Sequence, residues 1–284
     1  MRFSIITASY NPGDKIEKTI HSVLEQTFRD YEIIIKDACS TDGSVENLIR
    51  KPEVAKEIAS GKIRLFVQPD QGVYDGMNQA ITQAGGDFLL FLNCGDTLHD
   101  AEVLQKVEKF LQTEVISAAG EKEQSREERI KEIVYGDTFC EQTGQTDFAA
   151  PLINGFTCYR NIPCHQSCFY AKRLFEEKQY DTSLRIRADY DHFLWCVFDR
   201  YVKPKYMNFI VSDYEGGGIS ETKDNREQDK QEHEEVIRRY MTPQEIGRYR
   251  RRMALTLAPV RKKIAESKTL SGVYQKVKQT IYHA

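Results

Sequence analysis

Residues 88–96 read FLLFLNCGD, an unbroken apolar run that ends in a polar turn. Five apolar residues in a row predict a strand that is buried on both faces. Asp96 closes the turn at the carboxyl end of this strand. Ligands bind at that edge of the strands in an open α/β sheet. A carboxylate in this position is typical of a site for a metal ion or a sugar hydroxyl.

The first hundred residues alternate between strand-like and helix-like stretches. Short apolar stretches predict four strands, at 3–8, 31–36, 62–67 and 88–92. Apolar residues at helical spacing, such as Ile16, Ile20 and Val23, predict helices between these strands. We expect one continuous helix from the loop at 40–43 to about Ser60. Strand–helix–strand repetition predicts a parallel sheet with helices on both faces.

The remainder of the sequence predicts elements of both kinds. Helices are expected at about 100–111, 189–198 and 224 onward. Strands are expected at about 133–139, 166–170 and 206–211. The predicted fold class is therefore α/β, with long polar helices at the C-terminal end.

Three carboxylates follow three successive predicted strands. Asp37, Asp70 and Asp96 each stand just after such a strand. The carboxyl ends of parallel strands share one edge of a sheet, so we expect these acids to lie close together. A single Asp of this kind is more often a helix cap or turn residue. Three acids on one edge favour a site for a polyol and a cation.

Common phosphate-binding loops are absent from the sequence. No GxxxxGK[ST] occurs, and no GxGxxG follows the first predicted strand, which argues against P-loop NTPases and nicotinamide dehydrogenases. The seven cysteines include no CxxC pair and are interpreted as reduced thiols. Cys164, His165 and Cys168 match no common zinc spacing.

An acid-rich segment, ADYDH at 188–192, opens a predicted helix. Carboxylates in a first helical turn are favoured by the helix dipole alone. Asp189 or Asp191 is alternatively a general base, which must be ionised and within reach of an incoming hydroxyl. Position in the sequence does not separate these two interpretations.

Four segments together resemble family 2 glycosyltransferases, which have the GT-A fold. They are IITASYN at 5–11, TIHSVLEQTFRDYEIIIKDACSTDGS at 19–44, QPDQGVYDGMNQAITQAGGDFLLFLNCGD at 68–96 and ADYDHFLW at 188–195. The resemblance covers residues 3 to about 220, in the family's order and spacing. It is greatest to the branch that builds bacterial capsule, exopolysaccharide and lipopolysaccharide units. It implies a Rossmann-like, mostly parallel sheet in a catalytic domain at 1–222, followed by a basic helical extension at 223–284.

The resemblance also implies roles for individual residues. Tyr10 would lie against the nucleotide base, and Asp37 would accept a hydrogen bond from it. The donor pocket would be lined by Asp70, Gly72, Asp75, Asn78 and Asn93. Asp96 would hold Mn²⁺ or Mg²⁺ on the diphosphate.

On the acceptor side, the resemblance implies Asp189 as the catalytic base, with Asp191 as the fallback. His165 and Gln166 are candidates for contact with the acceptor. The mobile loop that closes over the donor would comprise Gly216, Gly217 and Gly218, with Ile219 and Ser220.

The chain departs from the family pattern at three positions. Asn93 and Gly95 stand where many relatives carry Asp, which leaves Asp96 as the remaining acid of the metal motif. Ala188 stands where relatives usually carry Glu, which leaves Asp189 of that acid pair.

The activity that the resemblance implies is an inverting transfer from a nucleotide-sugar, with a UDP-sugar favoured, to a hydroxyl of a glycan or lipid-linked acceptor. The alternatives are a sugar nucleotidyltransferase and a catalytically weak protein that binds nucleotide-sugars. A nucleotidyltransferase is disfavoured because no early glycine-rich basic loop is present.

The C-terminal 43 residues differ in charge from the rest of the chain. Residues 242–284 contain ten Lys and Arg and two Glu, whereas the whole chain has a net charge of -3. A basic amphipathic segment suits an anionic membrane surface, although a solvated helix is the plainer interpretation. Nucleic acid is not expected as a partner, because the main body is acidic. With no signal-peptide pattern and no apolar run of about 18–20 residues, the expected location is cytoplasmic, peripheral on the inner face of the cytoplasmic membrane.

Overall fold

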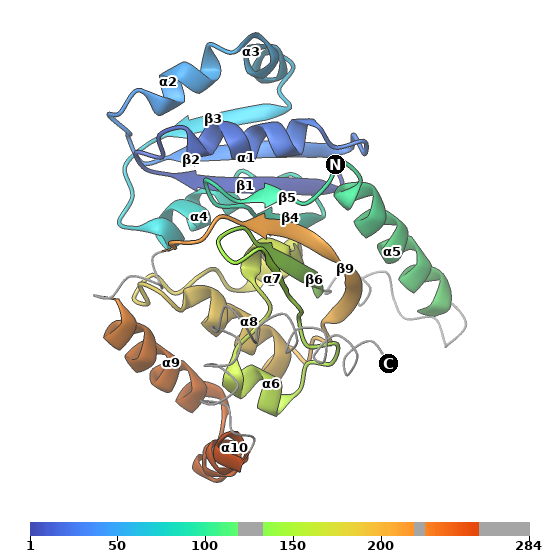
Figure 1. Ribbon diagram of the computed structural model, residues 1–284, viewed down its shortest axis with the longest axis vertical. Helices are drawn as coiled ribbons and strands as arrows, with labels where there is room; N and C mark the ends of the chain where they lie inside the picture. The colour runs from blue at the N-terminus through green and yellow to red at the C-terminus, as the bar shows by residue number, and fades with distance from the viewer. Residues whose placement is uncertain (119–132, 219–224, 256–284) are drawn as a thin grey trace.

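The structure is a computed structural model that describes residues 1–118, 133–218 and 225–255 (Figure 1). Ile219 and Ser220 of the expected mobile loop lie outside the described residues, as does the C-terminal end of the basic extension from 256 onward.

Within the described residues, nine strands form one sheet in the order β3-β2-β1-β4-β8-β6-β9-β5, with β7 paired to β6. The strands are β1 (Phe3–Ser9), β2 (Tyr31–Asp37), β3 (Ile63–Val67), β4 (Phe88–Phe91), β5 (Thr97–Leu98), β6 (Ile133–Cys140), β7 (Gln145–Asp147), β8 (Cys168–Ala171) and β9 (Lys205–Tyr214). Neighbouring strands among β3, β2, β1 and β4 are parallel. β8 runs antiparallel to β4 and β6, whereas β9 runs parallel to β6. The expectation of a mostly parallel α/β sheet is confirmed.

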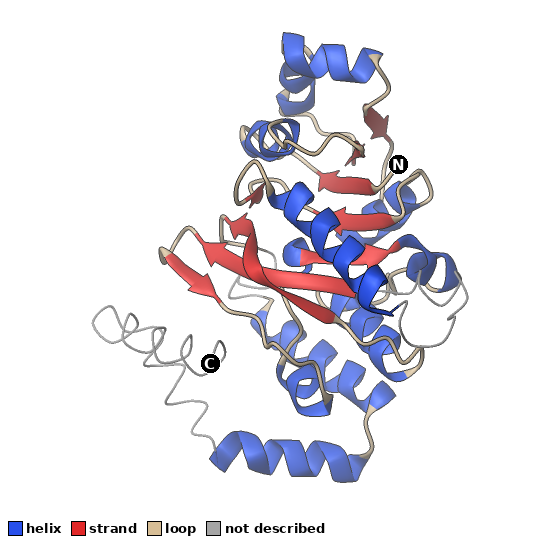
Figure 2. Ribbon diagram, turned by 90° about the vertical axis from the view of Figure 1, so that its right-hand side faces the viewer, coloured by secondary structure: helices blue, strands red, loops and turns tan. Residues whose placement is uncertain are grey.

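Helices lie in front of and behind the strands (Figure 2). In the first half of the chain they are α1 (Lys15–Leu24), α2 (Ser44–Ile49), α3 (Pro52–Ala59), α4 (Val73–Ile81) and α5 (Val103–Ala118). In the second half they are α6 (Gly155–Arg160), α7 (Lys172–Glu177), α8 (Ala188–Phe198), α9 (Arg226–Tyr240) and α10 (Pro243–Leu255), with a 3₁₀ turn, η2 (His165–Ser167), before β8. Because helices cover the sheet on both sides, strands such as β2 and β4 are buried along their whole length.

The predicted continuous helix up to Ser60 was wrong. The structure has two helices instead, α2 and α3, which are separated at Lys51. Lys51 has extended backbone angles, φ -65° and ψ 128°, and Pro52 occupies the first position of α3. A residue before proline avoids the helical region, and proline lacks the N–H that a continuing helix needs.

The C-terminal helices pack on the second half of the sheet domain. α9 lies alongside α8 (Figure 1), and Val236 and Ile237 of α9 are fully buried. α10 packs on α6, where the ring of Tyr249 lies against Phe156 and Tyr159.

Candidate active site

Asp37 and Tyr10 lie at the carboxyl edge of neighbouring strands β2 and β1. Asp37 is buried and accepts three hydrogen bonds: from Ser9 Oγ at 3.0 Å, Ser40 N at 2.8 Å and Ser40 Oγ at 2.6 Å. It therefore fixes the loop after β2 against the end of β1. Tyr10 is 69% exposed at this edge.

Asp70, after β3, is paired with a buried lysine. Lys36 Nζ lies 2.5 Å from Asp70 Oδ2, and the lysine side chain is fully buried. Asp70 Oδ1 accepts a further bond from Gly72 N at 3.1 Å. A Cβ on Gly76 of α4 would stand only 2.8 Å from Asp70 Oδ2, so the carboxylate is enclosed by the helix. The sequence reasoning missed Lys36, whose signal is a single cation in the apolar strand YEIIIKD.

Three other predicted donor residues lie in or next to α4. Gly72 has φ 135°, in a region that favours glycine. Asp75 accepts from Gln71 N at 2.9 Å, which holds the first turn. Asn78 exchanges two hydrogen bonds with the backbone of Tyr180, at 2.9 and 3.0 Å. The amide of Asn78 is therefore engaged with the protein, whereas Tyr74 on the same helix lines the pocket described below.

Asp96 lies in the turn between β4 and β5 and is 3% exposed. Its Oδ1 accepts from Glu215 N at 3.1 Å. Burial raises the pKa of Asp96 to about 6, and the charge of Glu215 adds to the rise, whereas the Glu215 N–H bond, His165 and Lys18 oppose it. The carboxylate is therefore a buried anion that a cation would stabilise.

The backbone at residue 95 favours glycine, and the Glu215 carboxylate lies beside it. Gly95 has φ 100°, and a Cβ at this position would collide with the Glu215 carboxylate. Glu215 follows β9 and pairs with Lys15 Nζ at 2.5 Å. A second acid thus lies beside Asp96, but it comes from a segment 119 residues away in the sequence. Sequence reasoning missed it, because no motif in the sequence marks Glu215.

The described residues contain no group of three or more His, Cys, Asp and Glu side chains that are placed to hold a metal ion. Mg²⁺ is usually bound through one or two carboxylates, with the remaining positions taken by water and substrate phosphates. The hard oxygen donors at Asp96 and the unbalanced charge there fit such an ion.

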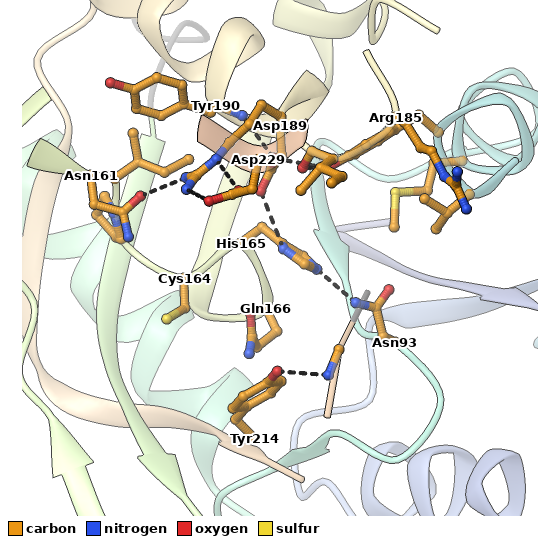
Figure 3. Close-up of a pocket in the computed structure, with 18 residues that line it drawn as sticks. Asn93, Asn161, Cys164, His165, Gln166, Arg185, Asp189, Tyr190, Tyr214 and Asp229 are labelled. Atoms are coloured by element: carbon orange, nitrogen blue, oxygen red, sulfur yellow. Dashed lines mark hydrogen bonds and ion pairs between the residues drawn. The ribbon is translucent and has the colours of Figure 1, made fainter. Parts of the chain in front are cut away.

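A pocket of about 390 Å³ lies beyond this edge, between α4, η2 and the start of α8. Asn93, His165, Gln166 and Asp189 all line it, as Figure 3 shows. These residues come from three separate segments, the turn after β4, η2 and the start of α8, so the fold brings the predicted acceptor residues together with Asn93.

A chain of polar contacts crosses this pocket. Asn93 Nδ2 lies 3.0 Å from His165 Nε2, and His165 Nδ1 lies 3.4 Å from Asp189 Oδ2 (Figure 3). Tyr74 donates its hydroxyl to Asp189 Oδ1 at 2.9 Å, and Tyr190 N donates to the same oxygen at 2.8 Å.

These contacts set the charge states of the acid and the imidazole. Burial raises the pKa of Asp189, but the contacts with His165 and Tyr74 and the charge of Arg187 outweigh it and hold the pKa below its ordinary value. Burial lowers the pKa of His165, but Asp189 and the charge of Asp96 outweigh it and raise the pKa above 6.5. Asp189 is therefore ionised at neutral pH, which a base requires.

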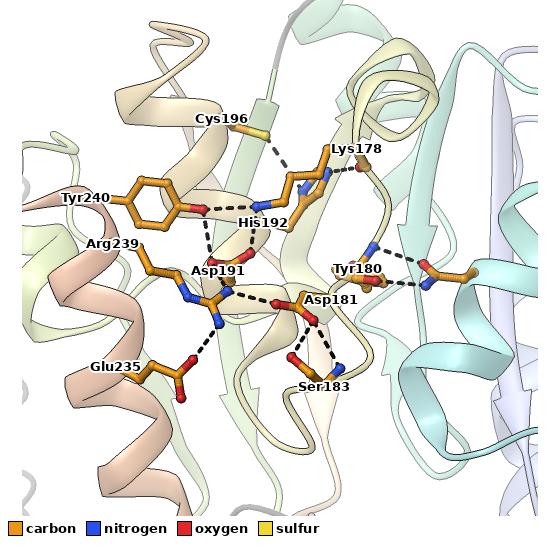
Figure 4. A network of polar contacts seen from close by, with 11 residues as sticks. Lys178, Tyr180, Asp181, Ser183, Asp191, His192, Cys196, Glu235, Arg239 and Tyr240 are labelled. Carbon is orange, nitrogen blue, oxygen red and sulfur yellow. Dashed lines mark hydrogen bonds and ion pairs between the residues drawn. The ribbon is translucent and has the colours of Figure 1, made fainter.

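Asp191, the fallback base, lies away from the pocket. It is fully buried in a separate network, where it accepts from Lys178 Nζ at 2.7 Å, Arg239 at 3.0 Å and Tyr240 OH at 3.0 Å (Figure 4). The two acids are two residues apart on α8 and therefore point in different directions. Asp191 ties α8 to α9 and does not line the pocket.

The loop before Asp189 is held by α9. Glu232 accepts hydrogen bonds from three successive backbone N–H groups, those of Arg185, Ile186 and Arg187, at 3.0, 2.8 and 2.8 Å. Arg187 also donates to Asp229 Oδ2 at 2.9 Å, and Asp229 lines the pocket. Sequence reasoning missed both acids, because one charged residue among many on a polar helix carries no signal.

The glycine loop begins at the pocket rim. Gly216 and Gly217 have φ 93° and 74°, which explains the glycines there. Gly218 N donates to Tyr214 OH at 3.1 Å, and both residues line the pocket.

The family model and the similar proteins are all described as glycosyltransferases. The sequence model of the family described as "Glycosyl transferase family 2" matches residues 4–155. A "PGL/p-HBAD biosynthesis glycosyltransferase" of Mycobacterium bovis (strain BCG / Pasteur 1173P2) is 32% identical over 223 residues, which cover 78% of this chain and 79% of the relative. The "Putative teichuronic acid biosynthesis glycosyltransferase TuaG" of Bacillus subtilis (strain 168) is 37% identical over 93 residues, which cover 33% of this chain and 35% of the relative.

Solved structures agree on the fold. The structure of S. aureus TarS 1-349 in complex with UDP-GlcNAc matches with a TM-score of 0.63 and 17% identity, over 89% of this chain and 72% of that one. The mannosyltransferase PcManGT from Pyrobaculum calidifontis, in complex with GDP-Man and Mn²⁺, matches with a TM-score of 0.61 and 14% identity. The match covers 98% of this chain and 87% of that one. In a longer TarS chain, the match covers 37% of that protein. The expected GT-A fold is confirmed.

Proposed function

Because this chain belongs to glycosyl transferase family 2, we propose that it is an inverting enzyme that moves a sugar from a nucleotide-sugar to an acceptor hydroxyl in bacterial surface-polysaccharide synthesis. The observation that carries this proposal is the ionised carboxylate of Asp189 on the wall of a pocket beside the Asp96 edge. Relatives named for PGL/p-HBAD and teichuronic acid biosynthesis support the role in surface glycans.

In the proposed reaction, the acceptor oxygen forms a bond to the anomeric carbon as the bond from that carbon to the diphosphate breaks. The diphosphate departs with the bonding electron pair, and the acceptor proton passes to Asp189. Such a base contributes about 10²–10⁴ in rate. Tyr74 and the backbone of Tyr190 hold one carboxylate oxygen, whereas the other faces His165 and the pocket.

We propose Asp96 as the protein ligand of Mn²⁺ or Mg²⁺, with Glu215 beside it. A divalent cation there would offset the negative charge that develops on the diphosphate. Two opposite charges 4 Å apart interact by about 4 kcal/mol at an effective dielectric constant of 20. The PcManGT complex with Mn²⁺ supports a cation in this fold.

For the donor we favour a UDP-sugar, in line with the UDP-GlcNAc complex of the TarS neighbour. The exposed ring of Tyr10 would take the base at the Asp37 edge, and Asn93 would border the sugar. Asp70, Gly72, Asp75 and Asn78 would act by fixing α4 along the donor pocket, because each is engaged within or against that helix.

On the acceptor side, His165 and Gln166 line the same pocket as Asp189, and the glycine loop from Gly216 to Gly218 borders it. We propose a glycan acceptor, lipid-linked, and closure of this loop over the donor.

We further propose a catalytic domain at 1–222 and a basic extension at 223–284 that attaches the cytoplasmic enzyme to the inner face of the membrane. On α10, Arg248, Arg250, Arg251 and Arg252 are exposed. Each basic residue near an anionic surface adds about 1 kcal/mol to binding. No helix among the described residues is long and apolar enough to cross a bilayer. Co-sedimentation with anionic and neutral vesicles tests the attachment, and equal binding to both would contradict it.

A panel of UDP-, GDP- and TDP-sugars, with and without Mn²⁺, tests the proposed function. We expect one donor to release nucleoside diphosphate when acceptor is supplied. Release of pyrophosphate during synthesis of a nucleotide-sugar would instead indicate a nucleotidyltransferase. Donor binding without turnover would indicate a binding protein.

A further inference from the structure

The family resemblance places Asn93 at a position of the metal motif, yet its amide is engaged elsewhere. Its Nδ2 lies 3.0 Å from Nε2 of His165, on the pocket side of the turn. The other ring nitrogen of His165, Nδ1, faces Asp189 Oδ2 at 3.4 Å (Figure 3). The imidazole therefore connects the residue after β4 with the acid at the start of α8.

We propose that Asn93 and His165 are positioning residues for Asp189, so that Asn93 serves the base and not the metal ion. This inference rests on the proposed role of Asp189 as the base. His165 holds the carboxylate from one side while Tyr74 and the Tyr190 backbone hold it from the other. Asn93 in turn fixes the plane of the imidazole.

The chemistry of an amide explains why Asn suits this position. An amide has both N–H donors and a carbonyl acceptor. When His165 carries a proton only on Nδ1, the Asn93 amide donates to Nε2. When both ring nitrogens are protonated, the amide turns over by half a rotation so that its oxygen accepts from Nε2. Asn93 therefore holds the ring in either protonation state, as Asp189 gains and loses its proton.

An Asp at position 93 would behave differently. An ionised carboxylate only accepts hydrogen bonds, so it would favour the imidazolium form of His165 between two acids. The base would then face a fixed cation throughout the cycle. The same substitution, if residue 93 instead faced the metal ion, would add a ligand beside Asp96.

The charged and titratable groups around His165 come from several elements. Asp189 on α8 and Asp96 in the β4–β5 turn both raise its pKa. The neighbouring thiol of Cys164 is neutral, because burial raises its pKa to about 12. Arg187 acts on Asp189 and favours its ionised form.

Nuclear magnetic resonance of the histidine rings in the full chain tests the proposal without substrate. His165→Gln assigns the resonance of His165 among the six histidines. In the wild-type chain, we expect the neutral ring to carry its proton on Nδ1, and the opposite tautomer would overturn the proposal. This wild-type measurement does not depend on a variant that folds.

Asn93→Asp then separates the two roles of residue 93. We expect the titration midpoint of His165 to rise by about 1–3 pH units, as for a new opposite charge at close range, while Mn²⁺ affinity stays within about twofold. Tighter Mn²⁺ binding with an unchanged midpoint would overturn the proposal and place residue 93 at the metal. Asn161→Asp is the matched control, because it adds the same charge to the pocket wall beside Arg187.

The readout also separates this inference from the proposed function. Suppose that no nucleotide-sugar is turned over, but the titration midpoint of His165 rises in Asn93→Asp as expected. The proposed function then fails, while the contact between Asn93 and His165 is supported. If nucleoside diphosphate is released but the titration midpoint of His165 does not change in Asn93→Asp, only the positioning role fails.

Discussion

Tyr74 on α4 donates its hydroxyl to Asp189 on α8, with the two oxygens 2.9 Å apart. The same hydroxyl lies 2.7 Å from the backbone oxygen of Ile186, so its single proton is shared between the two acceptors. The helix that borders the donor pocket is thus joined directly to the acid that we propose as the base. A substitution of Tyr74 should therefore change the pKa of Asp189.

Tyr74→Phe removes this link and should affect both stability and pH dependence. We expect the free energy of unfolding to fall by about 1–2 kcal/mol, because a buried hydrogen bond is lost and the Ile186 oxygen loses a donor. The contact lowers the pKa of Asp189, so its loss raises that pKa. The acid limb of the rate profile should then move to higher pH. An unchanged acid limb would contradict a contact between Tyr74 and the base.

Asp96→Asn should stabilise the metal-free protein while weakening donor binding. Burial raises the pKa of Asp96 from 3.8 to about 6. When folding raises the pKa of a carboxyl, the folded protein loses stability as pH rises through the range between the unfolded and folded pKa values. One pKa unit corresponds to about 1.4 kcal/mol, so we expect the variant to gain about 1–3 kcal/mol above pH 6.

Denaturant titrations in EDTA at pH 8 and pH 4 check this expectation, since the gain should vanish below about pH 4. In the same variant, Mn²⁺-dependent binding of the nucleotide-sugar should weaken at least tenfold. A variant that is no more stable than the wild-type chain at pH 8 would show that Asp96 is not an unbalanced buried anion.

Glu232→Gln should loosen the loop that leads to Asp189. The carboxylate accepts three backbone hydrogen bonds, and bonds to a charged group contribute about 1.5–3 kcal/mol each in favourable cases. We expect a loss of about 2 kcal/mol or more in the free energy of unfolding, together with a lower kcat. Glu234→Gln on the same helix is the matched control, because Glu234 is paired with the surface arginines Arg238 and Arg250. Equal stability of the two variants would argue against a stabilising role for the three backbone hydrogen bonds to Glu232.

Gly95→Asp adds an acid directly before Asp96 but should not strengthen metal binding. The backbone at 95 has φ 100°, and the Glu215 carboxylate occupies the side-chain space. We expect a loss of about 1–3 kcal/mol in stability from the backbone strain and no gain in Mn²⁺ affinity. Gly144→Asp is the control for strain alone, because its φ is 64° and its side-chain space is open. A gain in Mn²⁺ affinity for Gly95→Asp would contradict the placement of Glu215.

The sequence predicts seven of the nine strands among the described residues, because each of these has a local apolar signal, but it misses the short strands β5 and β7. The apolar run before Asn93 predicts β4. Asp37 ends β2, and Asp70 and Asp96 follow β3 and β4, which belong to the same parallel part of the sheet. The break between α2 and α3 was not predicted, although Pro52 marks it.

The unpredicted parts of the site are contacts between residues that are distant in the sequence. Glu215 meets Asp96 across 119 residues, and Glu232 meets Ile186 across 46. Lys36 reaches Asp70 from inside an apolar strand. These side chains act only when the fold brings them together, so the sequence does not show the partner of any of them, even where a lone cation such as Lys36 stands out in an apolar strand. The separation of Asp189 from Asp191 has the same origin, since it depends on what packs against each face of α8.

Turnover of Asp189→Asn tests the central claim most directly. The measurement is nucleoside diphosphate release with the donor that the wild-type enzyme uses, beside donor affinity measured by thermal shift. We predict unchanged donor affinity and a fall in kcat of at least about 10², because a base of this kind contributes about 10²–10⁴. Near-normal kcat in this variant would contradict the assignment of Asp189 as the base.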